Sequence, residues 1–334
     1  MTQKETLTIG TISARPGTRA QGTIEVGELP DSSRIQLPLV LINGAKSGER
    51  LYLGAGIHGD EVNSIAITSE ALARVDPVAL AGEIVCIPVQ HPLALNADHR
   101  LPLAQFLKSP LDQAPADAWT CFPGDAYGNM AEQLAAAIFA VIRTCDYALD
   151  IHTPTRGGRY VPIAILPHKE LPAYGKAKAF AGALDPGWIM EGNTGMYVSR
   201  GILCVEATRA GIPSFTFEIG EGGRLEPPMV RTGAGCVLNA MMWLRMIDGQ
   251  RQMPQRRYEM KSFLGIRAKR GGLLYTDVEL GSEVERGTLL CRTVNIYGEE
   301  VERVLAPENG VFVRATTLST VATGDRVATL GLLQ

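Results

Sequence analysis

Apolar and amphipathic segments alternate along most of the chain. Short, nearly continuous apolar runs at residues 50–55, 83–88 and 146–153 predict buried strands. Between them, apolar positions recur every three or four residues at 64–75 and 130–142, which predicts helices with one face on a sheet. Alternating strands and helices are typical of an α/β fold. We therefore predict a mixed sheet, parallel at its centre and flanked by helices.

The first fifty residues have a different pattern. Their apolar runs at 6–12, 22–26 and 35–42 are short, and Pro and Gly separate them. Such runs predict an antiparallel edge that leads into the sheet.

The α/β pattern continues to about residue 252. It predicts a strand at 163–166, a helix at 173–184, a helical segment at 198–208, a central strand at 215–217 and a last helix at 230–247. By contrast, residues 90–129 contain five prolines and no periodicity. A long irregular segment inside a compact domain usually has a function. Because it carries His91, Asn96, His99 and Arg100 just after a strand, we expect it to form a wall of a substrate site.

The carboxyl-terminal part has the pattern of an all-β domain. Short strands separated by Gly turns fill residues 258–334, and the stretch that begins Met253-Pro indicates a linker. We predict an α/β domain of residues 1–252 followed by a β-sandwich that resembles the biotinyl and lipoyl carrier domains. Those carriers bear a modified Lys at a hairpin tip. The segment after Gly310 contains no lysine, so we expect no swinging-arm role.

Composition narrows the functional classes. The chain has 334 residues and a formal net charge of −3, with Lys and Arg scattered evenly, which argues against a nucleic-acid partner. The first residues lack the pattern of a signal peptide, and no apolar stretch is long enough to span a membrane. The six cysteines lie far apart without a C-x-x-C pair, so we expect them to be reduced and mostly buried, with Cys121 the least certain. These features predict a cytosolic protein.

A Gly-rich turn between the first predicted central strand and its helix carries His58 and Glu61. A His and a Glu three residues apart at such a turn can direct a ring nitrogen and a carboxylate toward one metal ion. The alternative is a turn capped by Asp60, with Glu61 placed favourably at the helix N-terminus. The pair becomes meaningful only if a third ligand and a base follow.

The third candidate ligand is His152, at the end of the predicted strand 146–153. Asp150 lies two residues earlier and therefore on the same face of the strand. Its carboxylate can accept the N–H of a metal-bound imidazole, as outer-shell carboxylates commonly do. The alternatives are a structural histidine and a buried carboxylate that caps a turn.

A candidate base follows the central strand 215–217. Glu218 lies at the carboxyl end of this strand, where open α/β sheets place their chemistry. Glu221 competes for the role. We prefer Glu218, because the strand holds it in place while the Gly-rich segment after it leaves Glu221 mobile.

Taken together, these motifs resemble the succinylglutamate desuccinylase/aspartoacylase family of the zinc carboxypeptidase superfamily. The resemblance rests on Gly56-Ile-His58-Gly-Asp-Glu61, Asp150-Ile-His152-Thr, Phe217-Glu218-Ile-Gly220 and the carrier-like carboxyl-terminal part. It implies that residues 1–252 form a zinc-dependent catalytic domain. The expected partner is a small N-acylated molecule, with no nucleic acid or membrane, and homo-oligomers are possible.

The resemblance also implies a mechanism. His58, Glu61 and His152 are the expected ligands of one Zn²⁺ per chain, and Glu218 is the expected base for a zinc-bound hydroxide that attacks an amide carbonyl. Arg100 matches the family arginine that stabilises the oxyanion or holds a substrate carboxylate; the alternative is a solvated loop arginine.

One segment departs from the family pattern. Members usually carry Asn-Leu-Asn-Arg before a Phe-Pro-Gly turn, where Asn and Arg bind the product carboxylate. This chain has Asp117-Ala-Trp-Thr-Cys-Phe-Pro-Gly124 instead, in which we expect Trp119 to pack rather than to bind. Either another arginine replaces the missing one, or the substrate is not an ordinary N-acyl amino acid. The candidate arginines are Arg156, Arg159, Arg209 and Arg224.

Three functions remain open at this point. The leading hypothesis is a zinc-dependent hydrolase of small N-acylated amino acids or amines. The second is a metallocarboxypeptidase that acts on short peptides, and the third is a non-catalytic binding protein that keeps the metal site. The carboxyl-terminal part could shape the site entrance or an oligomer interface.

Overall fold

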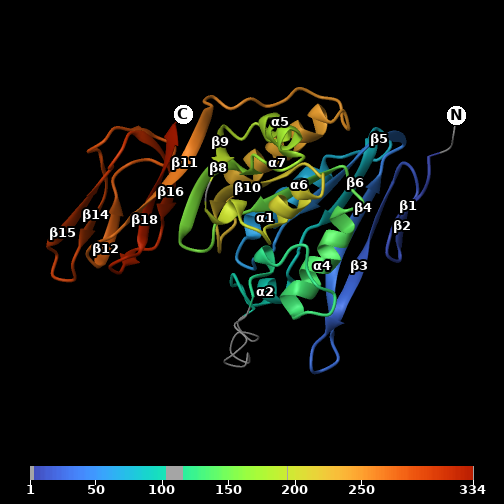
Figure 1. Ribbon diagram of the computed structural model, residues 1–334, viewed down its shortest axis with the longest axis horizontal. Coiled ribbons are helices and arrows are strands. Elements are labelled where there is room, and N and C mark those ends of the chain that lie inside the picture. The colour runs from blue at the N-terminus through green and yellow to red at the C-terminus, as the bar shows by residue number, and fades with distance from the viewer. Residues whose placement is uncertain (1–3, 103–115, 194, 334) are drawn as a thin grey trace.

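The molecule is built on one long mixed sheet. The computed structural model describes residues 4–102, 116–193 and 195–333. Twelve of its strands form this sheet, which extends from β3 to the carboxyl-terminal strands (Figure 1). In spatial order they are β13 (Glu283–Val284), β16 (Gly310–Thr316), β18 (Arg326–Leu333), β11 (Tyr258–Arg267), β9 (Trp188–Gly192), β8 (Gly158–His168), β10 (Ser214–Glu221), β7 (Tyr147–His152), β5 (Lys46–Gly54), β6 (Ala81–Ile87), β4 (Arg34–Asn43) and β3 (Thr18–Glu28).

The centre of the sheet is parallel and one edge is antiparallel. β10, β7, β5 and β6 run parallel to one another, so that their carboxyl ends lie at the same edge of the sheet. β3 and β4 pair antiparallel beyond them, beside the hairpin of β1 (Leu7–Ile9) and β2 (Ile12–Ala14). The predicted mixed α/β fold is confirmed.

Helices cover both faces of this sheet. One apolar cluster packs β strands against α1 (Val62–Ala73), α5 (Tyr174–Leu184) and α7 (Pro227–Trp243). The other contains side chains of α4 (Met130–Ile142), α6 (Leu203–Arg209) and the β1–β2 hairpin. α4 begins where its sequence predicts, because Asn129 and Glu132 form a reciprocal capping box. None of the described helices is long and apolar enough to cross a membrane.

The helix predicted at residues 198–208 is wrong in its first half. A short 3-10 helix, η2, covers Met196–Val198, and the α-helix α6 begins only at Leu203. Between them Gly201 has a φ of 89°, which favours glycine, and a side chain at this position would collide with the Thr120 carbonyl. The Gly201 carbonyl accepts a hydrogen bond of 2.9 Å from Phe122 N. This close approach interrupts the helix and packs the 118–122 loop against it.

The carboxyl-terminal part shares the main sheet. β11 pairs in parallel with β9, and β16 pairs with β8. β12 (Gly272–Thr276), β14 (Leu289–Val294), β15 (Glu300–Leu305) and β17 (Thr320–Val321) form a separate four-stranded sheet at the end far from the amino terminus (Figure 1). Side chains of both sheets, such as Leu290 and Phe312, make one apolar cluster. The sequence predicted strands here but not the shared sheet.

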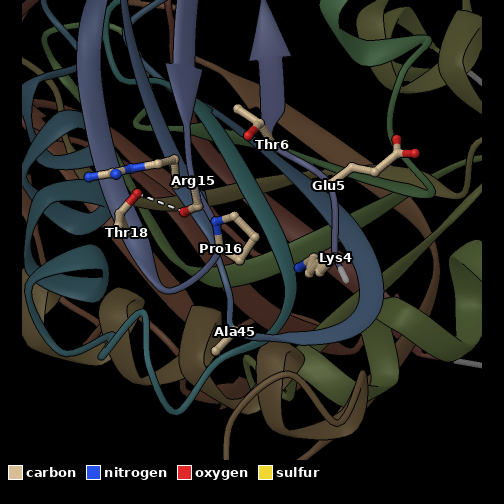
Figure 2. Close-up of a pocket in the computed structure, with 7 residues that line it drawn as sticks. All are labelled: Lys4, Glu5, Thr6, Arg15, Pro16, Thr18 and Ala45. Atoms are coloured by element: carbon tan, nitrogen blue, oxygen red, sulfur yellow. Dashed lines mark hydrogen bonds between the residues drawn. The ribbon is translucent and has the colours of Figure 1, made fainter. Parts of the chain in front are cut away.

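The amino-terminal segment is fastened to the sheet by Lys4. Its ammonium group donates to the carbonyls of Gly44, Lys46 and Gly82, at 2.9, 3.0 and 2.9 Å. Burial lowers the pKa of Lys4, and Glu83, 3.8 Å away, offsets only part of this shift. Lys4 lines a hollow of about 760 Å³ together with Arg15, Pro16 and other residues. Figure 2 shows these side chains. None of its lining residues belongs to the His58, Glu61 and His152 group described below.

We expect Lys4→Met to lower the free energy of unfolding by about 1 to 2 kcal/mol, because three carbonyls lose a charged donor. Denaturant titration measures the change. The control is Lys169→Met, which replaces an exposed lysine and should stay within about 0.5 kcal/mol of the wild type. If the two variants have equal stability, the amino-terminal contacts contribute nothing.

Candidate metal-dependent active site

A cavity of about 400 Å³ lies where the central parallel strands end. Its walls include His58 and Glu61 after β5, His152 at the end of β7 and Glu218 on β10. Parallel strands deliver their carboxyl ends to one edge, so these residues, distant in sequence, meet there. The carboxyl-terminal strands add Arg314 to the lining.

The turn that holds His58 and Glu61 is shaped by backbone contacts. A side chain at Gly59 would collide with the Ala94 carbonyl in α2 (Pro92–Asn96), so only glycine permits this approach. The alternative of a turn capped by Asp60 is wrong: α1 has no side-chain cap, and Asp60 instead accepts a hydrogen bond of 2.8 Å from Arg156 N. The turn is thus built to present its side chains to the cavity.

Three donor groups, two from this turn and one from the end of β7, converge at one point. His58 Nδ1 lies 2.5 Å from Glu61 Oε1, and His152 Nδ1 lies 3.0 Å from Glu61 Oε2. The donor atoms all lie within 4.8 Å of one another, and the three residues are at most 2% exposed. Two imidazoles and a carboxylate are a known donor set for catalytic zinc. The group could hold a metal ion.

A carboxylate stands behind each imidazole. Asp150 Oδ2 lies 3.0 Å from His152 Nε2, as the two-residue spacing predicted. Asp117 Oδ1 lies 3.1 Å from His58 Nε2. Hydrogen-bonded carboxylates fix the tautomer and the ring orientation of metal-binding histidines, as Asp117 can for His58. His152 Nε2 makes no hydrogen bond within the described residues, so Asp150 acts on this ring through its charge. Both rings direct Nδ1 toward Glu61.

The charges of the cluster favour a cation. Burial lowers the pKa of His58, but Glu61 and Asp117 outweigh burial and raise it above its ordinary value. Burial also lowers the pKa of His152, but Asp150 and Glu61 outweigh burial and raise this pKa well above its ordinary value. Burial raises the pKa of Glu61, yet the two imidazoles lower it to about 2. The carboxylates thus stabilise positive charge at this point, and a divalent cation supplies such charge in one atom.

Glu218 faces the same space from the neighbouring strand. β10 pairs with β7 so that Glu218 lies beside His152 in the register. Glu218 Oε1 accepts a hydrogen bond of 2.8 Å from the Tyr197 hydroxyl, whereas Oε2 is buried and has no hydrogen-bond partner in the described part of the chain. Burial raises the pKa of Glu218, and His152 lowers it in part. A buried carboxylate with a free oxygen is a suitable proton acceptor.

Glu221 is not in a mobile loop, and this expectation is wrong. It is the last residue of β10 and is only 5% exposed. Its Oε1 accepts hydrogen bonds from Thr317 Oγ1 at 2.7 Å and from Arg224 at 3.1 Å. Glu221 does not line the cavity, because these partners hold its carboxylate elsewhere.

Arg100 reaches the cavity, and its guanidinium is held by neighbours. It donates to Asp117 Oδ2 through Nε and Nη2, at 3.1 and 2.7 Å, and to Thr155 Oγ1 at 2.9 Å. The guanidinium carbon lies 6.0 Å from the centre of the Trp119 ring. Part of the expected loop wall therefore lines the cavity; residues 103–115 of that loop lie outside the described residues.

Four arginines were proposed to replace the missing carboxylate-binding arginine, and none of them lines the cavity. Each is paired with an acidic side chain instead. The pairs are Arg156 with Asp98 at 2.6 Å, Arg159 with Glu226 at 2.8 Å, Arg209 with Glu206 at 3.4 Å and Arg224 with Glu221 at 3.1 Å.

Several cavity residues were not identified from the sequence. Trp119, for which packing was preferred over lining an apolar pocket, is buried, donates through Nε1 to Asp150 at 3.2 Å and lines the cavity. Tyr197 and Arg314 carry no local signal, because they reach the site through strand pairing and turns. One indication for Asp117 was present in the sequence, because this residue lies in the segment that departs from the family pattern.

Comparisons with known proteins identify a family and relatives for this chain. Residues 47–244 match the family model of the succinylglutamate desuccinylase/aspartoacylase catalytic domain. A curated relative, the N-alpha-acetyl-L-2,4-diaminobutyric acid deacetylase of Halomonas elongata, is 23% identical over 306 residues, which cover 89% of this chain and 85% of that protein.

Solved structures share the fold. A succinylglutamate desuccinylase from Silicibacter sp. TM1040 has a TM-score of 0.81 at 19% identity, with 98% of this chain and 100% of that chain covered. The product-bound ectoine utilization protein EutE (DoeB) of Ruegeria pomeroyi has a TM-score of 0.80 at 20% identity, with 94% and 95% covered.

Proposed function

Because the chain belongs to the succinylglutamate desuccinylase/aspartoacylase family, whose named relatives are amide hydrolases, we propose that it is a zinc-dependent deacylase of a small N-acylated amino acid or amine. The observation that carries this proposal is the meeting of His58, Glu61 and His152 with Glu218 in one buried cavity.

In this proposal His58, Glu61 and His152 hold the metal. Zinc, when bound, acts as a Lewis acid and lowers the pKa of a coordinated water to about 7. Asp117, hydrogen-bonded to His58 Nε2, keeps that imidazole in the tautomer that leaves Nδ1 free to bind, and the charge of Asp150, 3.0 Å from His152 Nε2, favours the same tautomer there.

The protein groups then move the protons. Glu218 Oε2 takes a proton from the attacking water and delivers it to the departing amine nitrogen. Arg100, oriented by Asp117 and Trp119, donates hydrogen bonds to the carbonyl oxygen as negative charge develops on it. The apolar ring of Trp119 keeps bulk water from the imidazoles, since its centre lies 5.3 Å from that of His152.

Hydrolysis of a panel of N-acetyl, N-succinyl and N-formyl compounds by the zinc-loaded protein tests the proposal. Dipeptides serve as the comparison, because a carboxypeptidase would prefer them. Turnover of an N-acyl compound supports the proposal, whereas tight binding of the whole panel without turnover favours the non-catalytic alternative.

We expect Tyr197→Phe to shift the pH dependence of catalysis. The hydroxyl stabilises the ionised Glu218, so its loss raises the pKa of that carboxylate. A general base works only when ionised, and the acid limb of the kcat/KM profile should therefore move to higher pH. Tyr127→Phe is the control, since Tyr127 is 98% exposed. A uniform loss of activity without a shift of the acid limb would contradict this role.

The location and the domain division remain proposals. We propose a cytosolic protein, which is supported by the six free cysteines. We also retain the division into residues 1–252 and 258–334, and a carrier-like sandwich for the second part, with strands of that part in both sheets.

A further inference from the structure

The carboxyl-terminal strands add positive charge to the cavity. Arg314 on β16 and Arg326 on β18 both line it. β16 pairs antiparallel with β8, and this register sets Arg314 opposite Tyr160, which also lines the cavity. The site is thus incomplete without the part of the chain that follows residue 258.

The guanidinium of Arg314 is held in place but not neutralised. Its carbon lies 6.0 Å from the centre of the Tyr160 ring, and one edge rests against Gly158, where a side chain would displace it. Among the described residues, its buried Nη1 has no hydrogen-bond partner, and no salt bridge to an acidic side chain is formed. A buried guanidinium nitrogen without a partner is rare, because it loses its hydrogen bonds to water and forms none with the protein.

The other cavity arginines differ from Arg314. Arg100 donates twice to Asp117 and once to Thr155, and the proposed function uses its remaining N–H groups at the reacting carbonyl oxygen. Arg326 also lacks a side-chain partner in the described part of the chain, but it is exposed to solvent. Arg314 is therefore the cavity guanidinium best prepared for an anion.

We propose that Arg314 binds a carboxylate of the substrate, which makes the site selective for N-acyl compounds that carry one. The inference rests on the proposed function and names its substrate class. A planar guanidinium can hold a carboxylate with two parallel hydrogen bonds, as the arginine of the family's Asn-Arg pair would have done. The carboxylate can belong to the acyl group or to the amino acid.

The groups beside Arg314 favour a carboxylate over a cation. The Tyr197 hydroxyl donates to Glu218, and Tyr160, whose ring lies against Arg314, also lines the cavity. Burial raises the pKa of Tyr160 to about 12, so its hydroxyl stays neutral beside the guanidinium. An anionic group in the cavity can therefore bind the free Nη1 of Arg314 without repulsion from Tyr160.

The test compares substrates that differ only in charge. One pair is an N-acetyl amino acid and its carboxamide; the other is the N-succinyl and the N-acetyl derivative of one amino acid amide. We expect Arg314→Gln to lower kcat/KM for the carboxylate member of one pair about 30- to 100-fold, with less than about a threefold change for its neutral partner. The affected pair shows which end of the substrate carries the carboxylate.

Three further variants separate charge, geometry and folding. Arg314→Lys keeps the charge but loses the planar fork, so selectivity should fall by an intermediate amount. Gly158→Ala keeps Arg314 and displaces its guanidinium, and it should reduce selectivity in the same direction. Arg303→Gln, which removes a 61% exposed arginine that pairs with Glu300, is the control and should behave as the wild type.

Binding of succinate, measured by calorimetry, gives a readout independent of turnover. Arg314→Gln should weaken it at least tenfold relative to Arg303→Gln. Equal losses for charged and neutral substrates, or unchanged succinate affinity, overturn the inference. If the wild type hydrolyses no member of the panel but binds succinate through Arg314, the proposed function fails and the carboxylate site stands.

Discussion

Glu218→Gln is expected to reduce kcat/KM by about 10³-fold while the protein remains folded. General base catalysis contributes about 10² to 10⁴ in rate, and glutamine keeps the shape of the side chain but cannot accept the proton. Because Glu218 is 5% exposed and burial disfavours its charge, the neutral amide should not lower the melting temperature. Steady-state kinetics together with thermal unfolding measure both effects.

Glu221→Gln is the matched control for this prediction. Glu221 is on the same strand and equally buried, but it is bonded to Thr317 and Arg224. We expect this variant to lose about 1 to 2 kcal/mol of stability and to keep its activity within about threefold. The assignment of the base would be wrong if Glu221→Gln lost the activity and Glu218→Gln kept it.

Removal of the metal is expected to abolish turnover and to destabilise the protein. A chelator should reduce activity to a few per cent of its starting value, and one equivalent of zinc per chain should restore it. A ligand present at 1,000 times its dissociation constant stabilises the folded state by about 4 kcal/mol, so the melting temperature should fall on chelation. Elemental analysis gives the stoichiometry and the identity of the metal.

His152→Ala examines the same site without a chelator. The variant leaves Asp150 and Glu61 facing each other without the imidazole, and it should bind less than a tenth of an equivalent of metal. His168→Ala is the control, because His168 lies on the surface of β8 and contacts only Glu170 among the acidic residues described. Metal retained by His152→Ala, with full activity, would exclude the proposed centre.

The local parts of the site could be predicted from the sequence. His58 and Glu61 are three residues apart in one turn, and Asp150 and His152 are two apart on one strand, so their mutual placement follows from backbone geometry alone. That His58 and His152 would meet follows from the parallel order of β5 and β7. The structure brings them together, and their role as zinc ligands stays a prediction until metal is measured.

The distant parts of the site could not be predicted in this way. Arg314 reaches the cavity because β16 pairs with β8, and no local pattern specifies which strands of two regions will pair. The four arginines proposed instead were chosen for nearness in sequence to the motifs, and each turned out to have an acidic neighbour. Asp117 likewise acquires its role only through contacts with His58 and Arg100.

The shared sheet makes the folding of the α/β part dependent on the carboxyl-terminal strands. β11 and β16 cover the hydrogen-bonding edges of β9 and β8. A chain shortened before residue 258 would expose these edges as unpaired backbone, which is a template for aggregation. We therefore expect the carboxyl-terminal part to behave as a structural component of the main sheet rather than as a detachable module.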